Sequence, residues 1–306
     1  MIWRSISSTI GLSILLLFLL GSCEIINPEE EIPAYIRIDS IDLRLRDANR
    51  EGAASERITD AWVFVNDELI GAFELPVDVP VLKNEVANVK ISAGILNNGI
   101  SASRVRYPFY DVFELSEYEF VPGEVQTINP VVNYFEDLDF TWDEDFEDIS
   151  VAFDSMPNSD VRMDRTQDVA LILPTPEGDP NNNKSSGIIR LNETTPNFEA
   201  TSTPPLVLPK GGTEVYLEMD YNISTRMLVG MQIALDGIEF VVPIIDLNPT
   251  EDDNGNFGWN KTYIHLTPAV SSEVNASTYR LWFRAAHNPD QAESVLLLDN
   301  LKIIHP

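Results

Sequence analysis

Short stretches that alternate between apolar and polar residues recur along this chain, and Gly, Pro, Asn and Asp separate them. In the segment 35–45 this alternation predicts a half-buried strand, with Ile and Leu on one face and charged residues on the other, because successive side chains of a strand point to opposite faces of its sheet. Long helical periodicity is hard to find after residue 23. We therefore expect an all-β protein made of sandwiches or barrels.

Residues 58–94 form the clearest local unit of the sequence. A strand over 61–65, a turn at Asn66-Asp67 and a return strand over 68–75 predict a β-hairpin. The segment resembles small β-sandwich modules of the PEGA type, with Asn in place of the usual Asp at the turn. The matching residues are Ala61, Val63, Val65, Asn66, Ile70 and Gly71. The resemblance implies a small β-sandwich over residues 34–133 and indicates architecture more than activity.

The composition changes abruptly to acidic residues after residue 133. Between 134 and 150, eight carboxylates are interleaved with five aromatic residues. A disordered linker is poor in aromatic residues, so this run predicts a domain boundary that leads into the first strand of a second domain. We place that second domain at residues 134–306.

The second domain contains many strand-like segments separated by hairpin-like breaks. Strand candidates are residues 187–191, 214–221, 227–234, 239–243, 263–266, 279–285 and 294–304. The segment 145–148 resembles the opening strand, and 296–303 the closing strand, of carbohydrate-binding-module and galactose-binding-like families. The resemblance implies an antiparallel jelly-roll sandwich whose opening and closing strands are neighbours. It says less about a ligand, because one fold hosts many functions.

Proteins of these jelly-roll families often hold a structural Ca²⁺ between the opening and closing strands. The resemblance implies that Glu147 and Asp299 would supply carboxylate oxygens to one such ion, since Ca²⁺ prefers oxygen ligands. The alternative is that Asp299 caps a strand end and that Glu147 is solvated.

Two tryptophans are the candidates for ligand contact. Trp259 follows a polar loop, and Trp282 falls on the opposite strand parity to Tyr279, Leu281 and Phe283. If those three residues are core, Trp282 lies on the outer or concave face of its sheet. Aromatic faces suit the C–H-rich side of a sugar ring, so both tryptophans could bind a glycan.

Two arginines, Arg280 and Arg284, flank Trp282 on the same strand parity. We count them with the two tryptophans as candidate ligand-binding residues. The alternative is that Trp282 and the arginines form a stacked surface patch without a ligand.

Charge and motifs argue against several classes of function. With 20 Lys and Arg against 49 Asp and Glu, the formal net charge is -29, which repels a phosphate backbone and excludes nucleic acid as an expected partner. The three histidines lie outside any metal-ligand pattern, and no G-x-S-x-G or phosphate-binding glycine loop occurs. We expect no catalytic residues and assign the chain no enzymatic activity.

The first 22 residues have the zones of a secretory signal: one early Arg, an apolar stretch and small residues at the end. Leu20-Gly21-Ser22-Cys23 resembles the lipobox of bacterial lipoproteins, and Cys23 is the sole cysteine. The resemblance implies that residues 1–22 are removed and that Cys23 carries the acyl chains that attach the protein to a membrane. A short acidic tether over 23–33 resembles the signal that exports Bacteroidota lipoproteins to the outer face of the outer membrane.

Two functions remain open at this point. The first is a surface-exposed, non-catalytic lipoprotein whose second domain binds a glycan. The second is a structural or assembly subunit of a secretion or motility complex in the cell envelope, with a protein as its partner. A polysaccharide hydrolase is a third and weaker hypothesis, because 49 acidic residues always furnish some pair of carboxylates at a suitable distance.

Overall fold

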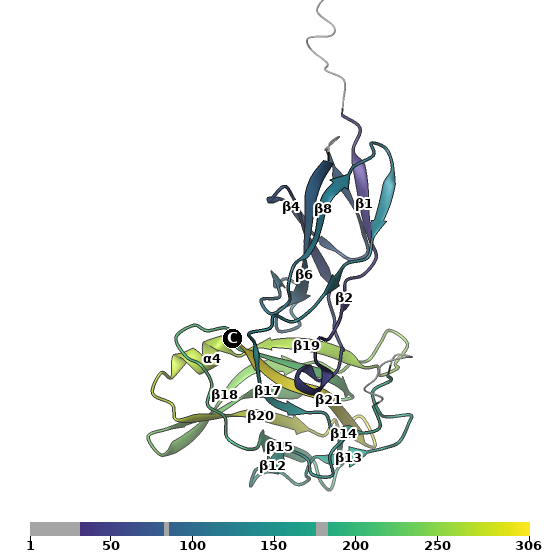
Figure 1. Cartoon of the computed structure of the whole chain (residues 1–306). Helices are drawn as coiled ribbons and strands as arrows, with labels where there is room; N and C mark the ends of the chain where they lie inside the picture. The colour runs from purple at the N-terminus through teal and green to yellow at the C-terminus, as the bar shows by residue number, and fades with distance from the viewer. Residues whose placement is uncertain (1–30, 83–85, 176–182) are drawn as a thin grey trace, which may run out of the picture.

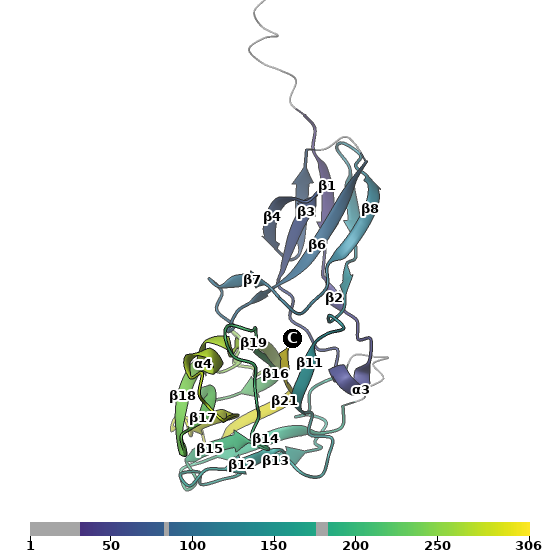
Figure 2. The same ribbon diagram turned by 60° about the vertical axis from the view of Figure 1, so that its left-hand side comes forward.

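The computed structural model describes residues 31–82, 86–175 and 183–306, which form two β-sheet units stacked end to end (Figures 1 and 2). The expected all-β class is confirmed: two short helices, α3 (Ala48–Glu51) and α4 (Thr267–Ser272), accompany the strands of the described segments. No helix in these segments has the length and apolarity needed to span a membrane. The predicted Cys23 and residues 1–22 lie outside the described residues.

The N-terminal unit is a small sandwich of two main sheets. One sheet has the order β5 (Val77–Val81), β1 (Ala34–Ile38) and β9 (Val125–Ile128). The other has the order β4 (Glu68–Glu74), β3 (Asp60–Val65), β6 (Val86–Leu96) and β7 (Arg104–Arg106), and β8 (Phe113–Glu119) also pairs with β6. Aliphatic side chains from both sheets share one buried core.

The predicted hairpin is confirmed in β3 and β4. Asn66 and Asp67 at its turn have φ angles of 51° and 64°, the left-handed values that both central residues of a two-residue type I′ turn require. The Asn66 side chain also accepts a hydrogen bond of 2.9 Å from the backbone N–H of Asn88, which fixes the turn against β6. Asn therefore serves here in place of the Asp that the PEGA-type motif carries.

The single strand expected over 35–45 is wrong, because two strands occupy this segment. β1 ends at Ile38, and β2 (Asp42–Leu43) pairs with β10 (Val131–Val132) in a separate two-stranded sheet. The apolar parity changes at Asp39-Ser40: Ile36 and Ile38 are buried on one parity, whereas Ile41 and Leu43 are buried on the other. The chain leaves its first sheet at this change of parity, since a one-residue slip exchanges the two faces of a strand.

The C-terminal unit is the expected antiparallel sandwich of two larger sheets. The first has the order β13 (Asp164–Thr166), β14 (Ser186–Leu191), β21 (Ser294–His305), β16 (Tyr216–Ile223) and β19 (Asn260–His265), and β11 (Asp139–Glu144) also pairs with β21. The second has the order β12 (Phe153–Ser155), β15 (Asn197–Ser202), β20 (Thr278–Ala286), β17 (Met227–Leu235) and β18 (Ile238–Leu247). A continuous apolar core lies between them.

The opening strand β11 and the closing strand β21 are neighbours, as the jelly-roll resemblance implied. The segment 145–148, however, lies after β11 and not inside it. The side chain of Glu144 accepts hydrogen bonds from the backbone N–H groups of Phe146, at 2.8 Å, and Ala152, at 2.5 Å, so the chain turns there. Phe146 has a φ of 57° and its ring is fully buried. The aromatic residue of the motif therefore packs inside the core and does not belong to a strand.

Because Gly187 in β14 has no side chain, it leaves the space that the Phe146 ring occupies. A Cβ atom at position 187 would lie 2.4 Å from the Phe146 ring, whereas a Cβ at Gly258 would meet nothing within 4 Å. Because the ring is fully buried, it cannot move aside without disturbing its neighbours.

We expect Gly187→Ala to lower the free energy of unfolding by about 1–3 kcal/mol through overpacking. Gly258→Ala, the matched control, should change it by less than about 0.5 kcal/mol. Urea unfolding followed by circular dichroism checks both values. Equal effects of the two substitutions would contradict the packing that we describe.

Candidate functional site

The two units meet through a cluster of buried aromatic rings. In the N-terminal unit the Tyr110 ring contacts those of Tyr107 and Tyr134, and Tyr107 contacts Tyr263 of β19, with ring centroids 4.8 Å apart. Tyr216 of β16 lies 5.3 Å from Tyr107 in an edge-to-face arrangement. Buried aromatic pairs of this kind contribute beyond their area alone, so the junction is a packed core that joins both units.

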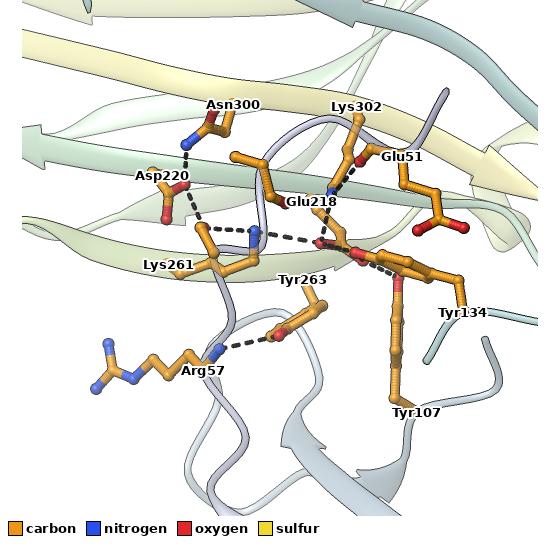
Figure 3. Close-up of polar contacts among 12 residues, drawn as sticks. Glu51, Arg57, Tyr107, Tyr134, Glu218, Asp220, Lys261, Tyr263, Asn300 and Lys302 are labelled. Atoms are coloured by element: carbon orange, nitrogen blue, oxygen red, sulfur yellow. Dashed lines mark hydrogen bonds and ion pairs between the residues drawn. The ribbon is translucent and has the colours of Figure 1, made fainter. Parts of the chain in front are cut away.

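A buried carboxylate, Glu218 of β16, lies at the centre of this junction (Figure 3). Its oxygens accept hydrogen bonds from the hydroxyl groups of Tyr107, at 2.8 Å, and Tyr134, at 3.0 Å. The ammonium groups of Lys261 and Lys302 lie 3.2 and 3.8 Å away. Burial alone would raise the pKa of Glu218, but the two lysines and the two hydroxyl groups outweigh it and hold this pKa below its ordinary value.

The same two lysines hold a segment of the N-terminal unit, residues 44–58, which we call the strap. The Lys302 ammonium donates hydrogen bonds of 2.9 and 3.2 Å to the carbonyl oxygens of Glu51 and Ala53. The Lys261 ammonium donates to the Ser55 hydroxyl at 3.0 Å, and the backbone N–H of Arg57 donates to the Tyr263 hydroxyl at 3.0 Å. The C-terminal sheet therefore fixes the strap at several points along its length.

Burial favours the neutral form of both lysines, but the net shift of the pKa differs between them. Burial lowers the pKa of Lys302 to about 8, although Glu218 opposes this effect. For Lys261, burial also favours the neutral form, but Asp220 and Glu218 outweigh it and raise the pKa of this group. Lys302 is therefore the junction lysine that loses its proton first as the pH rises.

A groove of about 1860 Å³ opens between the strap and the loops at one edge of the C-terminal unit. Its floor includes Asp220, Lys261 and Asn300, which also belong to the junction. The Asp220 carboxylate accepts hydrogen bonds from the Ser55 hydroxyl, at 2.5 Å, and the Asn300 side-chain amide, at 2.9 Å (Figure 3). One wall of the groove is therefore held in place by the same contacts that join the two units.

Trp259, a predicted ligand-binding residue, lines this groove and is half-buried. It directly precedes β19, whose first residue Asn260 donates a hydrogen bond of 3.3 Å from its side chain to the Tyr221 hydroxyl. Phe257, 37% exposed, lines the same groove. The side-chain amides that share the lining are Asn49, Asn183, Asn256, Asn260 and Asn300.

Hydrogen bonds to Asp252 fix the conformation of the loop that carries Phe257. The backbone N–H groups of Asn254 and Asn256 both donate to the Asp252 carboxylate at 2.8 Å. These hydrogen bonds lower the pKa of Asp252 and keep it ionised. The loop before Trp259 is therefore a hydrogen-bonded turn, which positions the indole at the groove.

Trp282, the second predicted aromatic residue, lies elsewhere. Tyr279, Leu281 and Phe283 point into the core, so the predicted parity of β20 is confirmed and Trp282 is on the outer face of its sheet. On that face the ring is nevertheless covered, since Trp282 is 3% exposed and its indole N–H donates to the Glu199 carboxylate at 2.8 Å. Trp282 belongs to the five-stranded sheet and Trp259 adjoins the other sheet, so the structure does not bring them together.

The two flanking arginines differ in their contacts. Arg280 donates to the carbonyl oxygen of Ser202 at 2.7 Å and lies 3.4 Å from Asp154, whereas Arg284 is exposed. Both are on the outer face of β20, away from the groove lining. Their role in ligand binding stays a prediction.

Glu147 and Asp299, the predicted calcium ligands, contact the same short segment. One Glu147 oxygen accepts from the backbone N–H groups of Lys184, at 2.7 Å, and Ser185, at 3.0 Å. Asp299 is fully buried and accepts from the Ser186 hydroxyl at 2.5 Å, and burial raises its pKa to about 7. Both carboxylates thus accept hydrogen bonds from the segment 183–186, Glu147 through one of its oxygens.

No three His, Cys, Asp or Glu side chains gather as a possible metal site within the described segments. The calcium ion stays a prediction.

The sequence did not reveal the junction residues. Glu218 and Lys302 occupy strand positions of outer-face parity, which a single sequence assigns to solvent. Only the docking of the N-terminal unit buries them. In β16 charged residues alternate with apolar ones, which was the only sign of these residues in the sequence. The same alternation occurs in a strand whose charged face is exposed to solvent and in one whose charged face lies in an interface.

No family model matches the chain, and no curated protein matches it. Among solved structures, a carbohydrate-binding module of the β-sandwich superfamily is 10% identical, with 90% of this chain and 99% of that chain covered and a TM-score of 0.33. The K3 adhesin domain of Lys-gingipain from Porphyromonas gingivalis is 13% identical, with 55% and 98% covered and a TM-score of 0.34.

The enzymatically active domain of a tailspike protein of bacteriophage CBA120 is 12% identical, with 52% of this chain covered and a TM-score of 0.36. This chain spans 20% of the tailspike domain. All three similarities concern the sandwich fold alone, so any function for this chain has to be argued from its own groove.

Glu218→Gln tests the junction. The substitution keeps the shape of the side chain but leaves two buried lysines without their carboxylate, and we expect a loss of about 3–5 kcal/mol in the free energy of unfolding. Glu114→Gln is the matched control, because Glu114 is exposed and lies 3.6 Å from Lys90; its loss should be below about 1 kcal/mol. Urea unfolding at pH 7 gives both values, and similar losses would show that Glu218 does not hold the junction.

The tyrosine cluster predicts loss of stability in alkali. Burial raises the pKa of Tyr107, Tyr110, Tyr134 and Tyr263 well above 10. Above pH 10 the unfolded chain releases protons that the folded chain retains, so each tyrosine should lower the free energy of unfolding by about 1.4 kcal/mol per pH unit. Unfolding curves between pH 9 and 11 measure this slope. Tyr110→Phe should reduce it by the contribution of one tyrosine, about 1.4 kcal/mol per pH unit. A slope unchanged by Tyr110→Phe would contradict the assignment.

Proposed function

We propose that this protein is a lipid-anchored, non-catalytic glycan-binding protein of the outer membrane surface, with its binding site in the groove beside the strap. The observation that carries the proposal is the half-buried indole of Trp259 in a groove lined with amides and carboxylates. An indole ring offers a flat apolar surface to the C–H face of a pyranose. Amides and carboxylates offer the acceptors and donors that ring hydroxyl groups need.

The size of the groove supports an extended ligand. Pockets for small molecules usually occupy about 300–1,000 Å³, and this groove is larger. A chain of several sugar units fits such a site better than one compact metabolite does. Trp259 and Phe257 on the loop 249–260 would provide the aromatic contacts, and the strap would form the opposite wall.

Two carboxylates of the groove accept hydrogen bonds from neighbouring protein groups, which favours binding of a glycan over its hydrolysis. Asp220 accepts hydrogen bonds from the strap and from Asn300, and Asp252 accepts those of its own loop. These groups hold the walls of the groove, which is a structural task. We therefore propose recognition of a glycan and not its hydrolysis.

Anchoring through Cys23 would place the groove away from the membrane. The first described residues lie at the end of the N-terminal unit that is farthest from the C-terminal unit (Figure 1). The N-terminal unit would then act as a stalk, and its 11-residue strand β6 alone spans about 35 Å at ~3.3 Å per residue. A binding site held at that height suits soluble or cell-wall glycans.

The buried junction favours a second candidate function, a structural subunit of an envelope complex with a protein partner. A fixed angle between two β-sandwiches is useful to a scaffold, and the Glu218 cluster provides one. Purification from detergent-solubilised membranes separates the two functions. A glycan-binding protein should elute alone, whereas a scaffold subunit should elute with stoichiometric partners.

Trp259→Ala tests the glycan site. We expect affinity for the glycan found on an array to fall at least about tenfold, a loss of about 1.4 kcal/mol or more, because the stacking surface is removed. Trp259→Phe should keep part of the affinity. Phe135→Ala serves as the control, since Phe135 is 38% exposed and does not line the groove. Calorimetric binding that is unaffected by Trp259→Ala, or the absence of any bound glycan, would refute the proposed site.

A further inference from the structure

Exposed aliphatic side chains gather at the free end of the N-terminal unit. Ile32 precedes β1, Leu82 follows β5 and Val125 begins β9, and their side chains are 63%, 59% and 58% exposed. Val86, the first residue of β6 on the facing sheet, is 56% exposed. We call these four residues the apolar tip.

The sheet order places three of these residues at one end of the same sheet. β1 lies between β5 and β9, with Ala34 opposite Val81 and Tyr35 opposite Val125. Ile32 lies just before this register begins and Leu82 just after it ends, so both lie at the sheet end near which Val125 begins β9. The three exposed side chains therefore share one end of the sheet.

The tip lies at the far end of the molecule from the groove. Figures 1 and 2 show the start of β1 at the end of the N-terminal unit opposite to the C-terminal unit. Within the described segments, nothing from the C-terminal unit reaches it. A cluster of exposed aliphatic residues at one pole of a chain with a net charge of -29 calls for a partner that is itself apolar.

The position of Cys23 identifies this partner. Eight residues separate Cys23 from Ile32, and even a fully extended chain of this length spans only about 30 Å. If Cys23 is acylated, the tip is confined to the layer next to the lipid head groups. Such confinement raises the effective concentration of membrane around the tip, so even a weak apolar contact forms.

We propose that the apolar tip rests on the lipid surface and orients the stalk upright, with the groove directed away from the membrane. This inference rests on the lipid anchor in the proposed function but not on the glycan site. Glu31, Glu119 and Glu124 lie at the same end and are exposed. They would keep the contact shallow and make it weaker on anionic than on zwitterionic lipid, because like charges repel.

A fluorescent label at the tip tests the proposal. In the acylated protein Cys23 is blocked, so Leu82→Cys provides the only free thiol for an environment-sensitive dye. In phosphatidylcholine vesicles we expect the dye emission to shift to the blue and to be quenched by nitroxide lipids. The same label on Val207→Cys, which is 73% exposed in the C-terminal unit, should show neither change. Equal behaviour of the two labels would overturn the proposal.

A triple variant separates docking from anchoring. Ile32→Ser, Leu82→Ser and Val125→Ser change exposed residues only, so the fold should persist, and a label on Val86→Cys should lose its blue shift while the protein stays on the vesicles. A persistent shift would overturn the apolar tip. Mass spectrometry of the N-terminal peptide reports acylation separately. A Cys23 without acyl chains would refute the anchor itself and the docking that depends on it.

Discussion

The buried carboxylate of Glu218 is the group on which the arrangement of this molecule depends. It lies on the C-terminal sheet, yet its hydrogen-bond donors Tyr107 and Tyr134 come from the N-terminal unit. An ion in such a place costs free energy unless its geometry is satisfied. Two hydroxyl groups and two ammonium groups satisfy it here. The two lysines lie on the same sheet as Glu218, so it is the docking of the two units that adds the two hydroxyl groups. The cluster therefore contributes orientation more than net stability.

The groove depends on the same cluster. Lys261 and Lys302 neutralise Glu218 and also hold the strap through Ser55 and the carbonyl oxygens of Glu51 and Ala53. If the units separated, the strap would lose these donors and one wall of the groove would be released. The groove is thus a property of both units together, and neither sandwich alone would have it.

Much of the fold follows from the sequence because strand periodicity records burial directly. The β3–β4 hairpin and the core parity of β20 were predictable in this way. The pairing of an opening with a closing strand was implied by the family resemblance instead, and the opening strand is β11, not the segment 145–148. The break between β1 and β2 was also visible, as a change of apolar parity at Asp39-Ser40, but the alternation on either side concealed it. β15 was missed, since its Thr201 and Ser202 look polar although both are buried.

The site was harder to predict, since it depends on contacts between distant segments. Trp259 was predicted as a ligand-binding residue from its type and loop position, and this stays a prediction. Nothing in the sequence joins it to the strap. From the sequence, Trp282 looked equally suitable for ligand contact. In the structure its ring is buried and its indole N–H is bonded to Glu199 on a neighbouring strand, a contact that the sequence does not reveal. Glu218 and Lys302 appeared to be surface residues because a single sequence does not show which sheet face another unit covers.

The fixed orientation of the two units can be measured by pulsed electron paramagnetic resonance on a soluble Cys23→Ser form. Spin labels on Leu69→Cys and Val274→Cys, which are 48% and 61% exposed in the N-terminal and C-terminal units, report the distance between the units. If the Glu218 cluster sets the orientation, the wild-type background should give one narrow distance distribution, and Glu218→Gln should broaden it. A broad distribution in the wild-type background, or one that Glu218→Gln leaves unchanged, would contradict the account.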